Sequence, residues 1–327
     1  MRVPGIWSAA LPALLALVVL AGCGGDDESS DSSSDAPSAS AFPDPPQRLE
    51  DLLADHQGGD QLVVSPAGSV FSEGRNRLGF GVFTLDRTQV TDADVAIYAA
   101  HGAAGQVEGP YPAGVESLET DPAFTAQTTA NDPDAAKVVY VSELQLDQPG
   151  EWRLMALVQE PGEDPTAVRM PSIVVRQGDP VPDVGEKAPV IHTPTTGDVG
   201  NVSEIDTRVP PDDMHNVDFA DVVGEKPVVL MFATPALCQS RVCGPVVDVA
   251  EQVKRDRGDD AAFIHMEIYD DNDVNKGLRP QVRAYHLPTE PWTFVIGADG
   301  RVSSRIEGAL SVGELEYALD RATASGA

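Results

Sequence analysis

Two cysteines, Cys238 and Cys243, lie between a segment that predicts a buried strand and a segment that predicts a helix. The apolar run at residues 227–232 is unbroken, as expected for a strand that is buried on both faces. Residues 244–258 begin with Gly-Pro, carry valines at helical spacing and end in basic residues, which is typical of a helix. A helix N-terminus lowers the pKa of a nearby thiol, and the thiolate is the reactive form. The pair therefore indicates redox or metal chemistry.

The third cysteine, Cys23, follows an N-terminal apolar stretch. Arg2 precedes this stretch, which covers residues 9–20, and residues 20–23 have the sequence LAGC. The pattern resembles the bacterial lipoprotein lipobox, which implies a signal peptide at residues 1–22 and lipidation of Cys23. We therefore expect an extracytoplasmic protein that is anchored to the cell membrane as a lipoprotein, where disulfides persist. The alternative is an ordinary secretory signal that ends in a chance cysteine.

The composition restricts the partners of the protein. The formal net charge of the 327 residues is -30, and the acidic residues are spread along the chain. Such a protein repels nucleic acid and anionic lipid surfaces, so we expect no nucleic-acid partner. Contact with the bacterial membrane must then depend on the lipid anchor.

The first half of the chain predicts a β-rich region behind a tether. Residues 23–42 consist mainly of Ser, Asp, Gly and Pro, which is typical of a disordered tether. Residues 48–56 predict a short helix. Period-two segments follow, separated by turn residues, and they predict strands at residues 77–85, 93–98, 137–141, 152–158 and 172–176. Short strands with no helix between them favour an immunoglobulin-like antiparallel β-sandwich over residues 43–178.

The second half has a different pattern. Residues 179–184 contain two prolines and predict a stiff linker, so we expect the regions on either side to fold independently. After the linker, predicted strands alternate with predicted helices in the order β-α-β and then β-β-α, which favours an α/β domain over residues 185–327. The expected fold class is α+β multidomain, with an antiparallel β-sandwich followed by an α/β domain.

Three segments of this second region carry motifs in a characteristic order. Residues 185–189 (GEKAP), 226–234 (KPVVLMFAT) and 289–300 (TEPWTFVIGADG) resemble the thioredoxin superfamily, in its redoxin and resA-like branch. The resemblance implies a cis bond at Pro291, preceded by Glu290, and a substrate-binding edge beside it. It also implies that the partners are the thiols and disulfides of other proteins. We expect no cofactor.

The cysteine spacing departs from the C-x-x-C of that family, because four residues separate Cys238 from Cys243. In a regular helix, residues five apart have Cα atoms about 8–9 Å from each other, whereas a disulfide needs about 4.4–6.8 Å. A Cys238–Cys243 disulfide therefore requires a helix that starts after Cys238, and we expect its start between Ser240 and Gly244. Arg241 lies between the two thiols, where it could stabilise a thiolate or be a solvated loop residue.

These observations leave several functional hypotheses. The leading one is a thiol–disulfide oxidoreductase, in which Cys238 attacks a partner disulfide and Cys243 resolves the mixed disulfide. The reverse assignment of the two roles stays open. A second hypothesis is copper binding or delivery, because two thiolates suit Cu(I) and His286 could complete the site. The third is a non-catalytic thioredoxin fold that serves as an interaction module and in which the disulfide is structural.

Overall fold

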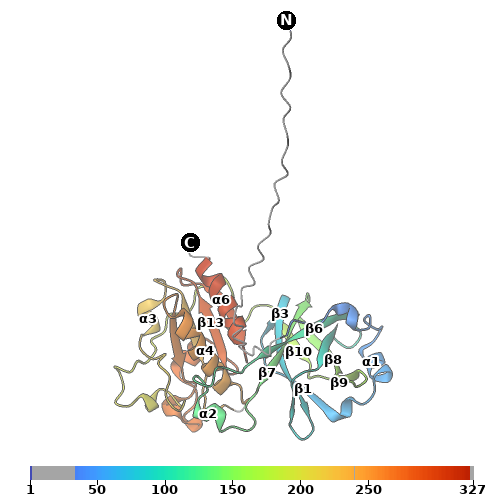
Figure 1. Ribbon diagram of the computed structural model, residues 1–327, viewed down its shortest axis with the longest axis horizontal. Coiled ribbons are helices and arrows are strands. Elements are labelled where there is room, and N and C mark those ends of the chain that lie inside the picture. Colours follow the sequence, from blue (N-terminus) through green and yellow to red (C-terminus); the bar gives the residue numbers. More distant parts are fainter. Residues whose placement is uncertain (2–33, 239, 325–327) are drawn as a thin grey trace. The chain divides into compact units, whose positions relative to one another are not determined.

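The computed structural model describes residues 1, 34–238 and 240–324 (Figure 1). The expected signal peptide and the lipidation residue Cys23 lie outside these residues. Within the described residues, no helix combines the length and the apolar character needed to cross a membrane. The described chain from Ser34 onward belongs to one compact unit of mixed α+β structure.

The first ten strands join in one hydrogen-bonded sheet. Their order is β1-β3-β7-β6-β5-β8-β10-β2, with β4 paired to β3 and β9 paired to β8, and all pairs are antiparallel except β2 with β10. The bounds are β1 (Leu62–Pro66), β2 (Phe71–Ser72), β3 (Gly74–Thr84), β4 (Gln89–Val90), β5 (Asp94–His101), β6 (Val107–Ser117), β7 (Val138–Leu146), β8 (Gly150–Gln159), β9 (Thr166–Arg169) and β10 (Ile173–Arg176). The helices of this region are α1 (Leu49–Asp55) and α2 (Gln127–Ala130), with 3-10 turns η1 (Ala39–Ala41) and η2 (Gly59–Gln61).

All five strands expected in this region are present, as is the short helix, which is α1. The period-two pattern has the expected cause: in β7, Leu144 and Leu146 are buried, whereas Glu143 and Gln145 are exposed. Because the ten strands form a single continuous sheet, the immunoglobulin-like sandwich stays a prediction.

Two segments that we expected to be flexible or extended connections are packed in the structure. At the end of the expected tether, Ser34 pairs with Val115 of β6, and Phe42 is buried in an apolar cluster. In the expected linker, Val181 is 1% exposed, and its carbonyl accepts a hydrogen bond from Arg305 at 3.1 Å. Each segment contains an apolar side chain that can be removed from water, which composition alone does not reveal.

The second region contains a four-stranded sheet in the order β12-β11-β13-β14. Strands β11 (Val228–Phe232) and β12 (Ala262–Met266) are parallel, whereas β13 (Trp292–Ile296) is antiparallel to β11 and to β14 (Val302–Glu307). Helix α4 (Cys243–Arg257) connects β11 to β12, and α6 (Val312–Ala324) follows β14. Figure 1 labels both helices together with β13. The shorter elements are η3 (Val202–Glu204), α3 (Phe219–Val222), η4 (Asp270–Asn272), η5 (Val274–Lys276) and α5 (Pro280–Ala284).

This order of elements is the β-α-β and β-β-α order that the sequence predicts. Every residue of β11 is buried, because β11 has neighbours on both edges and apolar clusters on both faces. The strand is therefore a buried base for the loop that follows it, and this loop leads to the two cysteines.

The segment between β6 and β7 packs against α4, so the two regions share contacts. The backbone N–H of Ala126 donates to the Asp248 carboxylate at 3.1 Å, and the carbonyl of Phe124 accepts from Arg208 at 2.6 Å. Leu118 belongs to the same apolar cluster as the valines of α4. The proline-containing linker therefore does not separate the regions in space.

Candidate functional site

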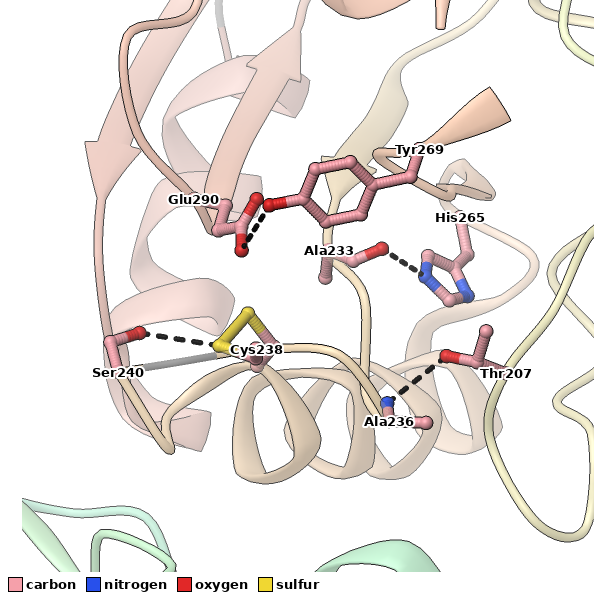
Figure 2. Close-up of a disulfide and its surroundings, with 9 residues drawn as sticks. Thr207, Ala233, Ala236, Cys238, Ser240, His265, Tyr269 and Glu290 are labelled. Carbon is pink, nitrogen blue, oxygen red and sulfur yellow. Dashed lines mark hydrogen bonds between the residues drawn. A yellow bond between two sulfur atoms is a disulfide. The ribbon is translucent and has the colours of Figure 1, made fainter. Parts of the chain in front are cut away.

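The two cysteines form a disulfide at the point where β11 gives way to α4 (Figure 2). Cys238 lies six residues after the end of β11, and Cys243 is the first residue of α4. Their Cα atoms are 6.0 Å apart, within the usual disulfide range. The helix thus starts where we expected, and Cys238 lies outside it, which is what allows a pair with four intervening residues to come within bonding distance.

The two sulfurs have different surroundings. Cys243 is fully buried in the apolar cluster that includes Val246 and Val247. Cys238 is only partly buried, and its Sγ atom lies 3.2 Å from the hydroxyl of Ser240, which is exposed. A reagent or partner protein can therefore reach the sulfur of Cys238 more easily than that of Cys243.

Glu290 lies close to the disulfide (Figure 2), and its peptide bond to Pro291 is cis. The hydroxyl of Tyr269 donates a hydrogen bond to the Glu290 carboxylate at 3.3 Å (Figure 2). Burial raises the pKa of the Glu290 carboxyl, and the hydrogen bond from Tyr269 offsets part of this effect. The structure thus places an acidic group of perturbed pKa beside the cysteines.

Arg241 is paired with an acidic residue of the β-rich region. Its guanidinium donates to both carboxylate oxygens of Asp132, each at 2.7 Å, and Asp134 lies 3.9 Å away. The hydrogen bonds to Asp132 raise the pKa of Arg241. Arg241 is thus an exposed residue of the loop before α4, as the second expectation has it, and its guanidinium pairs with Asp132 and not with a sulfur.

His286, the proposed third copper ligand, is exposed. Within the described residues, one group of at least three His, Cys, Asp or Glu side chains could hold a metal ion. This group contains neither His286 nor a cysteine. The structure therefore brings Cys238, Cys243 and Glu290 together, with Pro291 next to Glu290 in the chain, but it provides no support for adding His286 to them.

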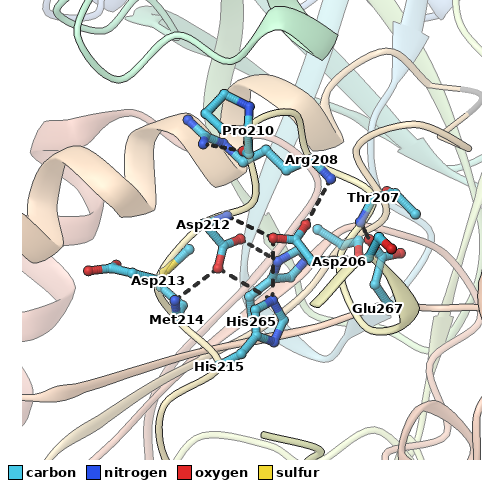
Figure 3. Close-up of polar contacts among 12 residues, drawn as sticks. Asp206, Thr207, Arg208, Pro210, Asp212, Asp213, Met214, His215, His265 and Glu267 are labelled. Carbon is cyan, nitrogen blue, oxygen red and sulfur yellow. Dashed lines mark hydrogen bonds and ion pairs between the residues drawn. The ribbon is translucent and has the colours of Figure 1, made fainter. Parts of the chain in front are cut away.

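The group that could hold a metal ion consists of Asp206, Asp212, His215 and His265 (Figure 3), and no motif in the sequence pointed to it. All four side chains are buried. Burial alone would lower the pKa of His265, but the charge and hydrogen bond of Asp212 outweigh it and raise the pKa. One signal was available in the sequence: His265 is a titratable residue in the middle of the apolar β12 segment.

Comparisons with known proteins give limited information. A scan against protein-family models and a search of the curated proteins found no match. Among solved structures, the chain is similar to a thiol:disulfide interchange protein, a thioredoxin family protein from Chlorobium tepidum TLS. The match covers 42% of this chain and 99% of that chain, with 18% sequence identity and a TM-score of 0.28. A similarity at this level does not assign a function, so the functional argument depends on the site itself.

Proposed function

We propose that the protein is a thiol–disulfide oxidoreductase that uses Cys238 and Cys243 in a thioredoxin-like domain. The observation that carries this proposal is the unequal burial of two bonded sulfurs at the start of a helix that follows a central strand. An accessible sulfur can form a bond to a partner, while a buried sulfur next to it can react only within the protein.

The reaction conserves electrons between the two proteins. In the reducing direction, the Cys238 thiolate attacks one sulfur of a partner disulfide, which breaks that bond and releases a partner thiolate. The Cys243 thiolate then attacks Cys238, which forms the Cys238–Cys243 disulfide and releases the second partner thiolate. This protein is oxidised and its partner is reduced, and the reverse sequence oxidises the partner.

The segment around Pro291 is the proposed binding edge for the partner backbone. Glu290 lies near the disulfide and is joined by a cis peptide bond to Pro291, whose backbone groups come just before β13. An extended peptide can bind such backbone groups through hydrogen bonds that do not depend on its sequence.

The test uses the full chain in a Cys23→Ser background, so that only two thiols remain. Cys243→Ser should trap mixed disulfides through Cys238, because the resolving step is lost, whereas Cys238→Ser should trap few. The parent protein should reduce insulin, and each single variant should lose nearly all of this activity. Mass spectrometry of trapped species and insulin turbidity are the measurements.

Other outcomes select the remaining hypotheses. Faster alkylation of Cys243 than of Cys238 in the reduced, folded protein would reverse the two roles. If neither thiol reacts until the protein is denatured, the disulfide is structural and the domain is an interaction module.

We further propose that the protein acts outside the cytoplasm and is attached to the cell membrane through a lipidated Cys23. Support comes from the sequence LAGC at residues 20–23 after an apolar stretch. Cys23→Ser should move the protein from the membrane fraction to the soluble fraction or leave the precursor uncleaved. Unchanged processing and fractionation would contradict the anchor.

A further inference from the structure

Four buried side chains converge in the second region of the protein. Asp206, Asp212 and His215 come from one loop before α3, and His265 comes from β12 (Figure 3). Each is between 1% and 7% exposed, and their ligand-type atoms all lie within 4.8 Å of one another. Burying two carboxylates is costly unless positive charge compensates them.

No lysine or arginine side chain in the described part of the chain balances the charge of this cluster. Among the described residues, no Lys or Arg side chain forms an ion pair with Asp206 or Asp212. The nearby Arg208 directs its guanidinium to Asp248 and to two backbone carbonyls instead. Two carboxylates carry a charge of -2, and the proton between His265 Nδ1 and Asp212 leaves about -1 unless His215 is protonated as well, whereas one divalent cation bound to two neutral imidazoles would neutralise both carboxylates.

His215 gives an independent indication of a missing partner. Its side chain is 1% exposed, and neither ring nitrogen makes a hydrogen bond within the described residues. Its Nε2 atom lies 3.4 Å from Asp212 Oδ1 and 3.7 Å from Asp206 Oδ2. Two ligands on a tetrahedral zinc ion are about 3.3 Å apart, given bond lengths of about 2.0–2.1 Å. These two separations therefore suit a shared ion.

The outer contacts of the cluster orient its ligand atoms. The backbone N–H groups of Arg208 and Asp212 donate to the Asp206 carboxylate at 2.8 and 2.7 Å, and that of Met214 donates to Asp212 at 2.9 Å. His265 Nε2 lies 3.1 Å from the carbonyl of Ala233. A metal-binding histidine commonly donates one ring N–H to a carbonyl, which leaves the other nitrogen free for the metal.

The other nitrogen of His265 shows what occupies this position without an ion. Its Nδ1 atom lies 2.6 Å from Asp212 Oδ2, which is shorter than two ligands of one ion would lie and suits a hydrogen bond that contains a proton. Metal binding would displace this proton from Nδ1 to solvent, and the two atoms would move apart by less than about 1 Å.

We infer that Asp206, Asp212, His215 and His265 bind one divalent transition-metal cation of the zinc class. Two imidazole nitrogens and two carboxylate oxygens form a ligand set that suits Zn²⁺, and four protein ligands in a buried position are typical of a structural site. The ion would fasten the loop at residues 206–215 to β12, next to Ala233 at the end of β11. This inference does not depend on the proposed redox function.

Zinc binding to the full chain tests the inference. The Cys23→Ser protein, in which Cys238 and Cys243 are the only cysteines, is kept oxidised so that no thiol can bind metal, then treated with EDTA, desalted and titrated with Zn²⁺ by calorimetry. We expect one equivalent of zinc per chain, with release of protons. His215→Ala should weaken binding by more than about 100-fold, because the change removes a direct ligand. His192→Ala is the matched control, since His192 also contacts a carboxylate, that of Asp218, but is exposed.

A second measurement covers the case in which His215→Ala does not fold. Co²⁺ added to the EDTA-treated wild-type protein should give the intense visible absorption of a four-coordinate ion, and one equivalent of Zn²⁺ should remove it. If the wild type binds neither metal, or if His215→Ala folds and binds zinc as the wild type does, the cluster is a buried network of charged residues and the metal site is wrong. Thiolate-to-metal absorption would place the ion at the cysteines and would equally overturn it.

Discussion

At the scale of single residues, the surroundings of the sulfurs determine which of them can react. Cys243 is enclosed by apolar side chains at the start of α4, whereas Cys238 is partly exposed beside Ser240. The carboxyl group of Glu290 lies near the disulfide (Figure 2). An ionised carboxylate close to a thiol disfavours the thiolate, so the protonation state of Glu290 should influence the reactivity of Cys238.

Glu290→Gln should change stability in a way that depends on pH. Burial raises the folded-state pKa of Glu290 above its ordinary value of 4.5, so the folded state binds the proton more tightly than the unfolded state. The wild type therefore loses stability as pH rises from about 4.5 through the raised pKa. We expect the Gln variant to have a higher urea midpoint than the wild type at pH 7 and a similar midpoint below pH 4.5. Glu225→Gln, at an exposed position, is the control.

The same substitution should affect the chemistry. In the reduced protein at pH 7, loss of the negative charge should make Cys238 alkylate severalfold faster, because more of the thiol is ionised. Unchanged rates in Glu290→Gln would mean that the carboxyl does not act on the sulfur.

At the scale of secondary-structure elements, the position of α4 depends on a buried ion pair. Asp248, on α4, is 1% exposed and accepts a hydrogen bond from Arg208 Nε at 3.0 Å. Its other carboxylate oxygen accepts from the backbone of Ala126, which belongs to the segment between β6 and β7. One carboxylate thus connects α4, the loop at residues 206–215 and the β-rich region.

Asp248→Ala should be strongly destabilising. The change leaves the guanidinium of Arg208 buried without its carboxylate and leaves the N–H of Ala126 without an acceptor, which should cost about 3–5 kcal/mol. Urea denaturation followed by circular dichroism measures the loss. Asp256→Ala, on the same helix, removes an exposed pair with Arg255 and should cost less than about 1 kcal/mol. Equal losses in the two variants would contradict the role of the buried pair.

At the scale of the whole molecule, the two regions form one compact unit within the described residues after Ser34. The apolar cluster around α4 includes Leu118 and Val139, which precede the linker, as well as Val246 and Leu315, which follow it. A fragment without the β-rich region would expose part of this cluster. The change in sequence pattern suggests that the two regions fold independently. The apolar contacts that they share oppose this expectation.

A fragment that begins at Asp183 should therefore be less stable than the same region in the full chain. We expect a loss of at least about 2 kcal/mol, which corresponds to the burial of roughly one large apolar side chain. Urea unfolding of both proteins, followed by near-ultraviolet circular dichroism, measures the difference. Coincident transitions would show that the two regions fold independently and that the shared contacts contribute little.

The sequence by itself determined the local structure near the disulfide. An unbroken apolar run becomes the central strand β11, and Gly244 and Pro245 lie in the first turn of α4, where proline is tolerated because its missing N–H has no helical partner. The order of strands and helices after residue 226 was also predictable, because each element carries its own periodicity.

Only the tertiary structure decided which distant residues meet. Asp132 lies 109 residues before Arg241, and Asp212 lies 53 residues before His265, so no local pattern couples either pair. Single polar residues within apolar segments look alike in sequence whether they are isolated or clustered. Their pairing depends on how β12, the loop at residues 206–215 and the segment before β7 pack together, and burial of Asp212 and His265 makes the pairing of those two residues necessary.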